Sequence, residues 1–388
     1  MLKKADSLYI HVPFCVRKCK YCDFYSVSVD DELVGRYVEA LERELQLYTG
    51  MLSRPLATIY VGGGTPTSLS MPHLRRLLGN LKKFVGPGTE YTIEANPGTL
   101  DNEKIGLCRF MNINRVSLGA QSFHDDELAG IGRIHTRREI FDSFKMLRDA
   151  GFDNINLDLI FALPGQSLKK WRESLRQAVR LSPEHISCYA LSYENGTEFH
   201  TQLSNGELQE IEDEEQLRMY NTAIYTLINA GFEHYEISNF ARPGLRCRHN
   251  LVYWFNYPYI GIGPSAASSF IHDSFTTRRT NIRDVRRWIS AMLDDSIPSP
   301  GETETLNMNM TMAETLMLRL RMREGMRLTN FGYRFGMSFE DAFPYSISTH
   351  LASGGLAMNG EKLMIPRERL FVANTVLADI VHEAAEKK

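Results

Sequence analysis

The sequence predicts an α/β protein built on a parallel sheet, as a partial or complete (β/α) barrel or an open doubly wound sheet, with a smaller, mostly helical second domain. Short β-rich runs alternate with amphipathic stretches, which is typical of βαβ units. The length of 388 residues exceeds one ordinary domain. From Thr311 onward the alternation gives way to a helical pattern.

Seven β-rich runs are expected to form the strands of the sheet. They are residues 8–11, 58–61, 91–94, 115–120, 155–161, 185–191 and 233–237. Amphipathic helices are expected between them, among others at residues 33–48, 137–147 and 214–228. Gly151 and Gly231 follow two of these helices and are typical C-cap glycines. In a parallel sheet of this kind, functional residues gather at the carboxyl ends of the strands.

The second half of the chain divides into two further parts. From residue 242 to 300 the alternation breaks into a stretch rich in Gly, Pro and aromatic residues, with five arginines at 278–287, which we interpret as a connector. A hairpin is expected around Asn359-Gly360 and a last helix at 370–386, in a winged-helix-like arrangement. We therefore assign residues 1–240 to the barrel, 241–304 to the connector and 305–388 to a C-terminal domain.

Composition and charge exclude several classes of protein. Hydrophobic residues make up 43% and charged residues 23%, as in soluble globular proteins. The net charge of −3 gives no general attraction to nucleic acid or to anionic membranes. No apolar run is long enough to span a membrane, and the first residues lack the apolar core of a secretory signal. We expect a cytoplasmic protein that does not bind nucleic acid.

Three of the six cysteines lie close together, as Cys15, Cys19 and Cys22, directly after the first predicted strand. The spacing C-x3-C-x2-C can hold three irons of a [4Fe–4S] cluster and leave the fourth iron open to an exchangeable ligand. Two alternatives stay open: a shared buried helix face, or a zinc site completed by His11 or Asp23. The proline before the motif and the aromatic residues around it disfavour a regular helix.

Other polar and glycine residues follow later strands. The run from Gly62 to Thr65 lets the backbone approach a ligand closely, but it lacks the lysine of a phosphate-binding loop. Glu94, Gln121 and Asp158 lie at or near strand ends, where polar groups can bind a zwitterionic, hydroxylated ligand.

The chain resembles the oxygen-independent coproporphyrinogen oxidase group of the radical S-adenosylmethionine (SAM) superfamily, and within it the haem-chaperone branch. The resemblance extends through nearly the whole chain. Its motifs are residues 7–24, 62–67, 94–97, 117–123, 158–166, 236–240 and 247–254. It implies the partial barrel of radical-SAM proteins and a [4Fe–4S] cluster on the three clustered cysteines. It also implies a SAM site formed by Tyr9, Tyr21, Gly63, Gly64, Thr65, Glu94, Gln121, Arg133 and Asp158.

The segment 249–254 matches a motif, HNxxYW, that is associated with haem in the chaperone branch. Its four defining residues are His249, Asn250, Tyr253 and Trp254. A histidine can supply an axial nitrogen to haem iron, and tyrosine and tryptophan can pack on a porphyrin. A histidine among aromatic residues can equally be an ordinary packed residue.

Two positions depart from the oxidase pattern. Phe24 stands where the oxidases carry a fourth cysteine, which argues against oxidase activity. Ala267 stands where family members commonly have a histidine, which puts the role of that imidazole in doubt here; His272 is nearby but out of register.

The leading interpretation is a haem chaperone that binds haem and a SAM-liganded [4Fe–4S] cluster and transfers haem to an acceptor protein. The alternative is an oxygen-independent coproporphyrinogen III oxidase, in which cleavage of SAM generates a radical that abstracts hydrogen from a porphyrinogen propionate. A third class, a radical enzyme that modifies nucleic acid, is disfavoured by the charge balance. The implied partners are haem, a haem-accepting protein such as a membrane-associated respiratory protein, and an electron donor such as flavodoxin or ferredoxin.

Overall fold

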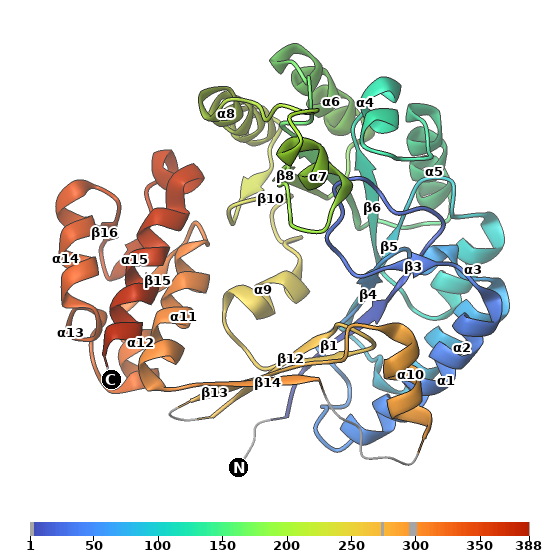
Figure 1. Ribbon diagram of the computed structural model, residues 1–388, viewed down its shortest axis with the longest axis horizontal. Helices are drawn as coiled ribbons and strands as arrows, with labels where there is room; N and C mark the ends of the chain where they lie inside the picture. The colour runs from blue at the N-terminus through green and yellow to red at the C-terminus, as the bar shows by residue number, and fades with distance from the viewer. Residues whose placement is uncertain (1–3, 273–274, 295–300, 388) are drawn as a thin grey trace.

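The main sheet of the protein has nine strands and is covered on its outer face by helices (Figure 1). The structure is a computed structural model that describes residues 4–272, 275–294 and 301–387. The strand order is β11-β1-β4-β5-β6-β7-β8-β10-β9. The strands from β11 to β8 are parallel, whereas β10 and β9 are antiparallel to their neighbours. With β11 and β9 as its two edges, the sheet is a partial (β/α) barrel, as the sequence predicts.

Six of the seven predicted strands are confirmed, with small shifts at their ends. The strands of the main sheet are β1 (Ser7–Val12), β4 (Thr58–Gly63), β5 (Glu90–Ala95), β6 (Arg115–Gln121), β7 (Ile155–Phe161), β8 (His185–Ala190), β9 (Glu233–His234), β10 (Asn239–Ala241) and β11 (Ile260–Ile262). The seventh prediction, residues 233–237 as a strand of the parallel series, is wrong. Only Glu233–His234 is a strand, β9. It does not pair with β8, because the chain turns back after it and β10 lies between β8 and β9, antiparallel to both.

The outer helices begin and end close to the predicted positions. They are α1 (Asp31–Tyr48), α2 (Met71–Leu81), α3 (Asn102–Phe110), α4 (Asp125–Gly130), α5 (Arg137–Asp149), α6 (Leu168–Leu181), α7 (Glu198–Ser204) and α8 (Asp213–Asn229). Each long helix turns an apolar stripe toward the sheet, as Leu41 and Leu45 of α1 do. Gly151 and Gly231 have φ values of 81° and 85°, so both take the left-handed C-cap conformation that was predicted.

The two faces of the parallel strands carry different side chains. In β1, Leu8, Ile10 and Val12 are fully buried among apolar residues. The intervening Tyr9 and His11 point to the other face, where Tyr9 lies beside Tyr60 of β4 with ring centroids 6.2 Å apart. Because successive residues of a strand alternate between faces, the interior of this barrel is largely polar while the helix-covered side is apolar.

The segment predicted as a connector is largely regular structure. It contains α9 (Arg248–Trp254), β12 (Ala267–Ile271), β13 (Thr276–Thr280), α10 (Val285–Leu293) and β14 (Glu302–Leu306), as well as β11. Two of these elements contribute to the barrel region: β11 extends the main sheet beside β1, and α10 packs on α1. The assignment of residues 241–304 as a connector stays a prediction. Within the predicted basic stretch, Arg278 forms an ion pair with Glu314. Residues 295–300, which belong to the predicted connector, lie outside the described residues.

The C-terminal part is mostly helical, with one small sheet, as expected. Its elements are α11 (Met308–Leu320), β15 (Met326–Arg327), α12 (Leu328–Phe335), α13 (Phe339–Ala342), α14 (Pro344–Ser353), β16 (Ala357–Asn359), β17 (Lys362–Met364) and α15 (Ala373–Glu386). The hairpin around Asn359-Gly360 is confirmed as β16 and β17. The last helix begins at Ala373, after a 3-10 turn at Arg367–Val372. The domain boundaries at 240/241 and 304/305 stay predictions.

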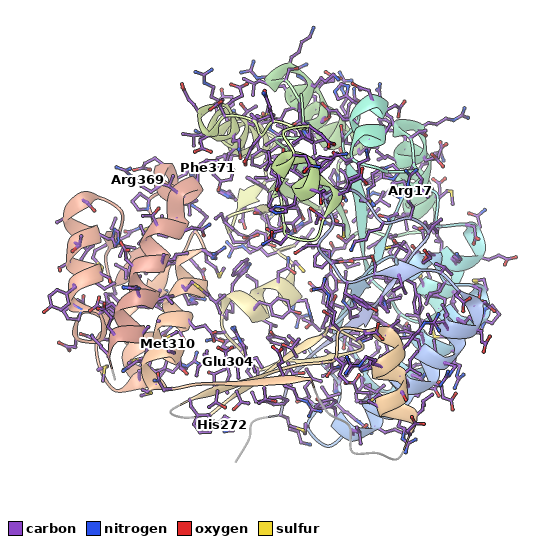
Figure 2. All side chains as sticks on the ribbon, in the orientation of Figure 1. Arg17, His272, Glu304, Met310, Arg369 and Phe371 are labelled. Carbon is purple, nitrogen blue, oxygen red and sulfur yellow. The ribbon has the colours of Figure 1, made fainter. Side chains whose placement is uncertain are left out.

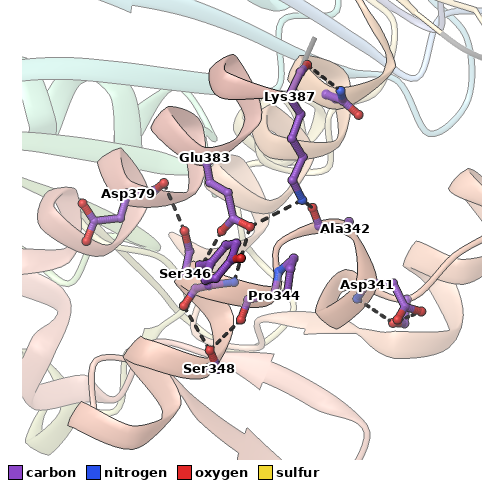
Figure 3. Close-up of polar contacts among 11 residues, drawn as sticks. Asp341, Ala342, Pro344, Ser346, Ser348, Asp379, Glu383 and Lys387 are labelled. Atoms are coloured by element: carbon purple, nitrogen blue, oxygen red, sulfur yellow. Dashed lines mark hydrogen bonds and ion pairs between the residues drawn. The ribbon is translucent and has the colours of Figure 1, made fainter.

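A polar cluster fastens α14 to α15 (Figure 3). The carboxylate of Glu383 accepts hydrogen bonds from the backbone N–H groups of Tyr345 and Ser346, at 3.3 and 2.8 Å. The hydroxyl of Ser346 in turn donates to the carbonyl oxygen of Asp379. Since the first N–H groups of a helix have no partner within it, Glu383 stabilises the start of α14.

Among the described helices, none combines the length and the hydropathy needed to cross a membrane.

Candidate functional site

A cavity of about 240 Å³ lies at the carboxyl ends of the parallel strands from β4 to β8. Eleven residues that the sequence singled out line it: Cys15, Cys19, Tyr21, Cys22, Gly63, Gly64, Thr65, Glu94, Gln121, Arg133 and Asp158. They come from five strands and from three loops, so only the fold brings them together. The cavity lies where a parallel barrel places its functional groups.

The three clustered cysteines lie in the segment that follows β1. Cys15 ends the short strand β2 (Phe14–Cys15), which pairs with β3 (Val27–Ser28), and residues 16–26 contain no helix, as predicted. The Cys15 Sγ lies 3.6 Å from the Thr65 hydroxyl, and Arg133 donates to the Cys19 Sγ at 3.6 Å. Burial raises the pKa of the Cys22 thiol to about 11. Binding a metal group here must therefore release protons from the thiols.

The donor set fits an iron–sulfur cluster better than a single ion. Within residues 4–272, 275–294 and 301–387, no group of three His, Cys, Asp or Glu side chains is arranged to hold one metal ion. In a cluster each thiolate binds a different iron, so the three sulfur atoms need not converge on one point. The other three cysteines, Cys108, Cys188 and Cys247, are buried elsewhere.

The glycine run packs against the cysteine-bearing segment. A Cβ on Gly63 would lie 2.7 Å from the His11 ring, and one on Gly64 would lie 2.5 Å from the Phe14 carbonyl oxygen. The N–H of Gly64 donates to Val12 and that of Thr65 to Phe14, at 2.8 and 2.7 Å. The absence of side chains is thus required by the protein's own packing, in addition to any approach by a ligand.

Glu94 and Asp158 are the two acidic residues of the cavity wall. Glu94 accepts hydrogen bonds from the Tyr60 hydroxyl at 2.8 Å and from the Gly63 N–H at 3.0 Å. Burial is the main reason why the pKa of Glu94 is raised to about 7. Asp158 accepts from the Ser117 hydroxyl at 2.9 Å and from the Asn156 amide at 2.8 Å. Both carboxylates are held in fixed orientations, ready to receive a cationic group.

Gln121 and Arg133 reach the cavity through local irregularities. The register between β6 and β7 shifts between Leu118 and Gln121, and Gln121 has a left-handed φ of 64°. Arg133 comes from the loop between α4 and α5 and donates to the Gly119 carbonyl at 3.0 Å. Its buried Nε has no hydrogen-bond partner within the described part of the chain. An unpaired buried donor at a cavity wall fits a ligand with a carboxylate.

One predicted contact residue lies elsewhere, and several wall residues were missed. Tyr9 is not among the residues that line the cavity; its hydroxyl lies 3.0 Å from the His11 Nδ1. Tyr60, Asn96, Ser117 and Tyr189 line the cavity but were not predicted. Three of them alternate with fully apolar positions on buried strands. That pattern of polar residues on one face of a buried strand could have revealed them.

The predicted haem motif lies on α9, near the amino ends of the strands. His249 is 1% exposed, its Nδ1 lies 2.7 Å from the Thr58 hydroxyl and its Nε2 lies 2.9 Å from the Tyr253 hydroxyl. Its ring stacks on that of Tyr60 with a centroid distance of 5.1 Å. Burial lowers the pKa of His249 to about 3, so the imidazole is neutral at pH 7. Both ring nitrogens of His249 thus form hydrogen bonds within the protein, to Thr58 and to Tyr253.

The other residues of the motif are half-buried. Asn250, Tyr253 and Trp254 follow on α9, and the buried Trp254 Nε1 has no partner among the described residues. Ala267 begins β12, where its backbone packs closely on Gly261. His272 does not replace the missing imidazole, because its ring stacks on Phe275 at the far end of the β12–β13 hairpin (Figure 2).

Comparisons with known proteins agree with this geometry. Residues 9–178 match the profile of the Radical SAM superfamily. The solved structure of coproporphyrinogen III oxidase (HemN) from Escherichia coli has a TM-score of 0.81 over 97% of this chain and 90% of that chain, at 20% identity. This likeness shows a shared fold. The fold and the cysteine-lined cavity define a radical SAM protein, a class that implies a [4Fe–4S] cluster and SAM.

Relatives in sequence show which family within the radical SAM class the chain belongs to. Heme chaperone HemW from Bacillus subtilis is 37% identical over 92% of this chain and 93% of its own length. Proteins of the same name from Synechocystis and from Escherichia coli are 40% and 37% identical, over 76% and 67% of this chain and 73% and 69% of their own lengths. The chain belongs to the HemW family.

Proposed function

We propose that this protein is a haem chaperone that binds haem and a SAM-liganded [4Fe–4S] cluster and passes haem to an acceptor protein. The observation that carries this proposal is the 37% identity to the Bacillus subtilis Heme chaperone HemW over nearly the full length of both chains. The chain also keeps every residue of the HNxxYW motif on α9.

Cys15, Cys19 and Cys22 would hold the cluster, since all three line one cavity and no fourth cysteine is near them in the sequence. When bound, the cluster supplies an electron and an open iron for the amino and carboxylate groups of SAM. Thr65 would orient the Cys15 thiolate through its hydroxyl, and Arg133 would balance the charge on the Cys19 sulfur.

The remaining wall residues would bind SAM, which carries a sulfonium, an ammonium, a carboxylate and a ribose. Glu94 and Asp158 offer negative charge to its cationic groups. The free Nε of Arg133 and the side chain of Gln121 offer donors to its oxygens. Tyr21, Gly63 and Gly64 would close the site around it. Tyr9 would affect SAM only through Tyr60, because its ring lies beside that of Tyr60 and it does not line the cavity.

His249 would supply an axial nitrogen to haem iron. The Thr58 hydroxyl donates to Ser7 at 2.9 Å, so it must accept from His249, which places the imidazole proton on Nδ1. The lone pair is then on Nε2, where it accepts from Tyr253. A haem iron would thus replace the Tyr253 hydroxyl, while Tyr253 and Trp254 pack on the porphyrin and Asn250 supports the helix.

The oxidase alternative is disfavoured by one position. Phe24, at the rim of the cavity, is 60% exposed and stands where the oxidases have their extra cysteine. An electron donor such as flavodoxin or ferredoxin would reach the cluster at this rim. The proposal also includes a haem-accepting protein that takes the haem from this chain, and a cytoplasmic location.

A haem titration of the reconstituted protein under anaerobic conditions tests it. The wild type should bind haem near one equivalent per chain, with a Soret band that changes in His249→Ala. Tyr253→Phe keeps the ring but frees the Nε2 atom, so it should bind haem at least as tightly as the wild type.

His382→Ala is the matched control, because His382 on α15 has a side chain that is 80% exposed. In parallel, the wild type should not convert coproporphyrinogen to protoporphyrinogen. Robust turnover, or haem binding that is the same in His249→Ala and His382→Ala, would favour the oxidase instead.

A further inference from the structure

A second cavity, of about 240 Å³, lies where the end of α9 meets the C-terminal part of the chain. Two aromatic residues just beyond α9, Phe255 and Tyr257, line it. Its lining also includes three cations and one acid, namely Arg319, Arg327, Lys362 and Glu324. None of these residues belongs to the cavity at the carboxyl ends of the strands.

The positive charge of this cavity is only partly balanced by Glu324, which pairs with Arg319. Arg327 and Lys362 are direct partners in the antiparallel pairing of β15 with β17, so two like charges stand opposite each other. Neither makes an ion pair or a side-chain hydrogen bond within the described residues. Like charges at directly opposed positions destabilise a sheet. An anion bound between them would remove this cost.

Arg319 adds a preorganised donor. Its side chain is only 12% exposed, and its guanidinium lies 4.4 Å from the centre of the Phe255 ring. One nitrogen donates to the Gly325 carbonyl at 2.9 Å and lies 3.4 Å from a Glu324 oxygen. The buried Nε has no partner within the described chain. An arginine held by stacking and left with a free donor is suited to a carboxylate.

The position on the chain indicates which carboxylates would bind. Phe255 is six residues beyond His249, a distance of about 9 Å along a helix. Haem is a flat apolar macrocycle with two propionate carboxylates on one edge. The cavity is below the range of about 300–1,000 Å³ that encloses a whole drug-sized ligand. It can therefore take the carboxylate edge, while the macrocycle lies against the aromatic residues of the α9 region.

We propose that Arg319, Arg327 and Lys362 bind the propionate carboxylates of the haem. This inference rests on the proposed haem-binding role of α9, and it adds a second anchoring point to the iron ligand. Glu324 offsets part of the positive charge and so limits how tightly the carboxylates are held, which suits a protein that must release its haem.

Titration with haem and with haem dimethyl ester, whose carboxylates are blocked, tests the proposal. The double variant Arg327→Gln/Lys362→Gln should bind haem about five- to tenfold more weakly than the wild type, as expected for two charge pairs at solvent-accessible positions. Both proteins should bind the dimethyl ester equally. Lys169→Gln/Arg172→Gln, which removes two exposed cations from α6, is the matched control and should bind haem like the wild type.

The outcomes separate this inference from the proposed function. If the wild type binds neither porphyrin, both are wrong. If it binds haem and the dimethyl ester with equal affinity, and the double variant binds haem normally, only the carboxylate site is wrong. A calorimetric signal for glutarate that the double variant lacks, with unchanged haem affinity, would assign the cavity to a different carboxylate and would also overturn the proposal.

Discussion

The two ends of the parallel strands use the same polar face in opposite ways. At the carboxyl ends, Glu94 lines an open cavity together with Arg133, whose Nε has no partner in the described chain. At the amino ends, Glu90 of the same strand β5 accepts two N–H groups of α9, from Arg248 and His249, both at 2.9 Å. The first region is an open cavity with an unpaired donor, whereas the second is a closed hydrogen-bond network. A ligand can enter the first directly but must displace a protein hydrogen bond in the second.

The sharpest test of the open region is loss of the cluster. Replacing Cys15, Cys19 and Cys22 together by alanine should abolish bound iron and the brown absorbance, because no other cysteine lines the cavity. Iron analysis after anaerobic reconstitution measures this. Cys108→Ala and Cys188→Ala are the controls, since both thiols are buried in the core. Equal iron loss in a folded control variant would refute the assignment.

A smaller effect is expected for the acidic wall residues. Glu94→Gln and Asp158→Asn should each weaken SAM binding about ten- to a hundredfold, the effect of removing one charged hydrogen-bond partner of a bound ligand. Equilibrium dialysis with the reconstituted protein measures the dissociation constants. The exposed Glu103→Gln on α3 serves as control. Unchanged affinity in both cavity variants would mean that SAM does not contact these carboxylates.

The pH dependence of SAM binding should reflect Glu94. Because burial raises the pKa of this carboxyl to about 7, it is protonated below that pH and must lose its proton before it can pair with a cation. The affinity should therefore fall as the pH drops below 7, by up to about tenfold per unit. Dissociation constants at pH 6, 7 and 8 measure this, and Glu94→Gln should show a flat profile over the same range.

The same shift in pKa affects the stability of the ligand-free protein. The folded state holds a proton on Glu94 at pH values where the unfolded chain has already lost it. The stabilising contribution of this proton is fully present below the ordinary pKa of a glutamate and is lost as the pH rises through about 7.

The smallest effect is expected where the two regions touch. Tyr60 donates to Glu94 at one end of its side chain and stacks on His249 with its ring. Tyr60→Phe removes only the hydrogen bond, so it should cost about 1 kcal/mol of unfolding free energy. It should also weaken SAM binding while haem affinity stays constant. Denaturant unfolding and the two titrations measure these effects; a matching loss of haem affinity would show that the regions are coupled.

Much of this fold follows from local sequence patterns. The period-2 runs gave six strands of the barrel, and the helical stripes gave α1, α5 and α8 nearly to the residue. The edge strands of the sheet could not be predicted from such patterns. One of them, β11, has only three residues, Ile260–Ile262, and pairs with a strand some 250 positions earlier. A run so short has no periodicity of its own. The antiparallel return of β10 and β9 escaped prediction for the same reason.

The candidate site, too, could be predicted only in part from local sequence patterns. The sequence by itself singled out the residues that we predict to carry chemistry: the cysteine spacing, the strand-end carboxylates and the α9 motif are all local patterns. Only the tertiary structure decided which of them are free to act. It placed Tyr9 behind Tyr60 and joined His249 to Thr58, 191 residues away. Contacts between distant segments decide whether a polar group is satisfied by the protein or left for a ligand, and no local pattern encodes them.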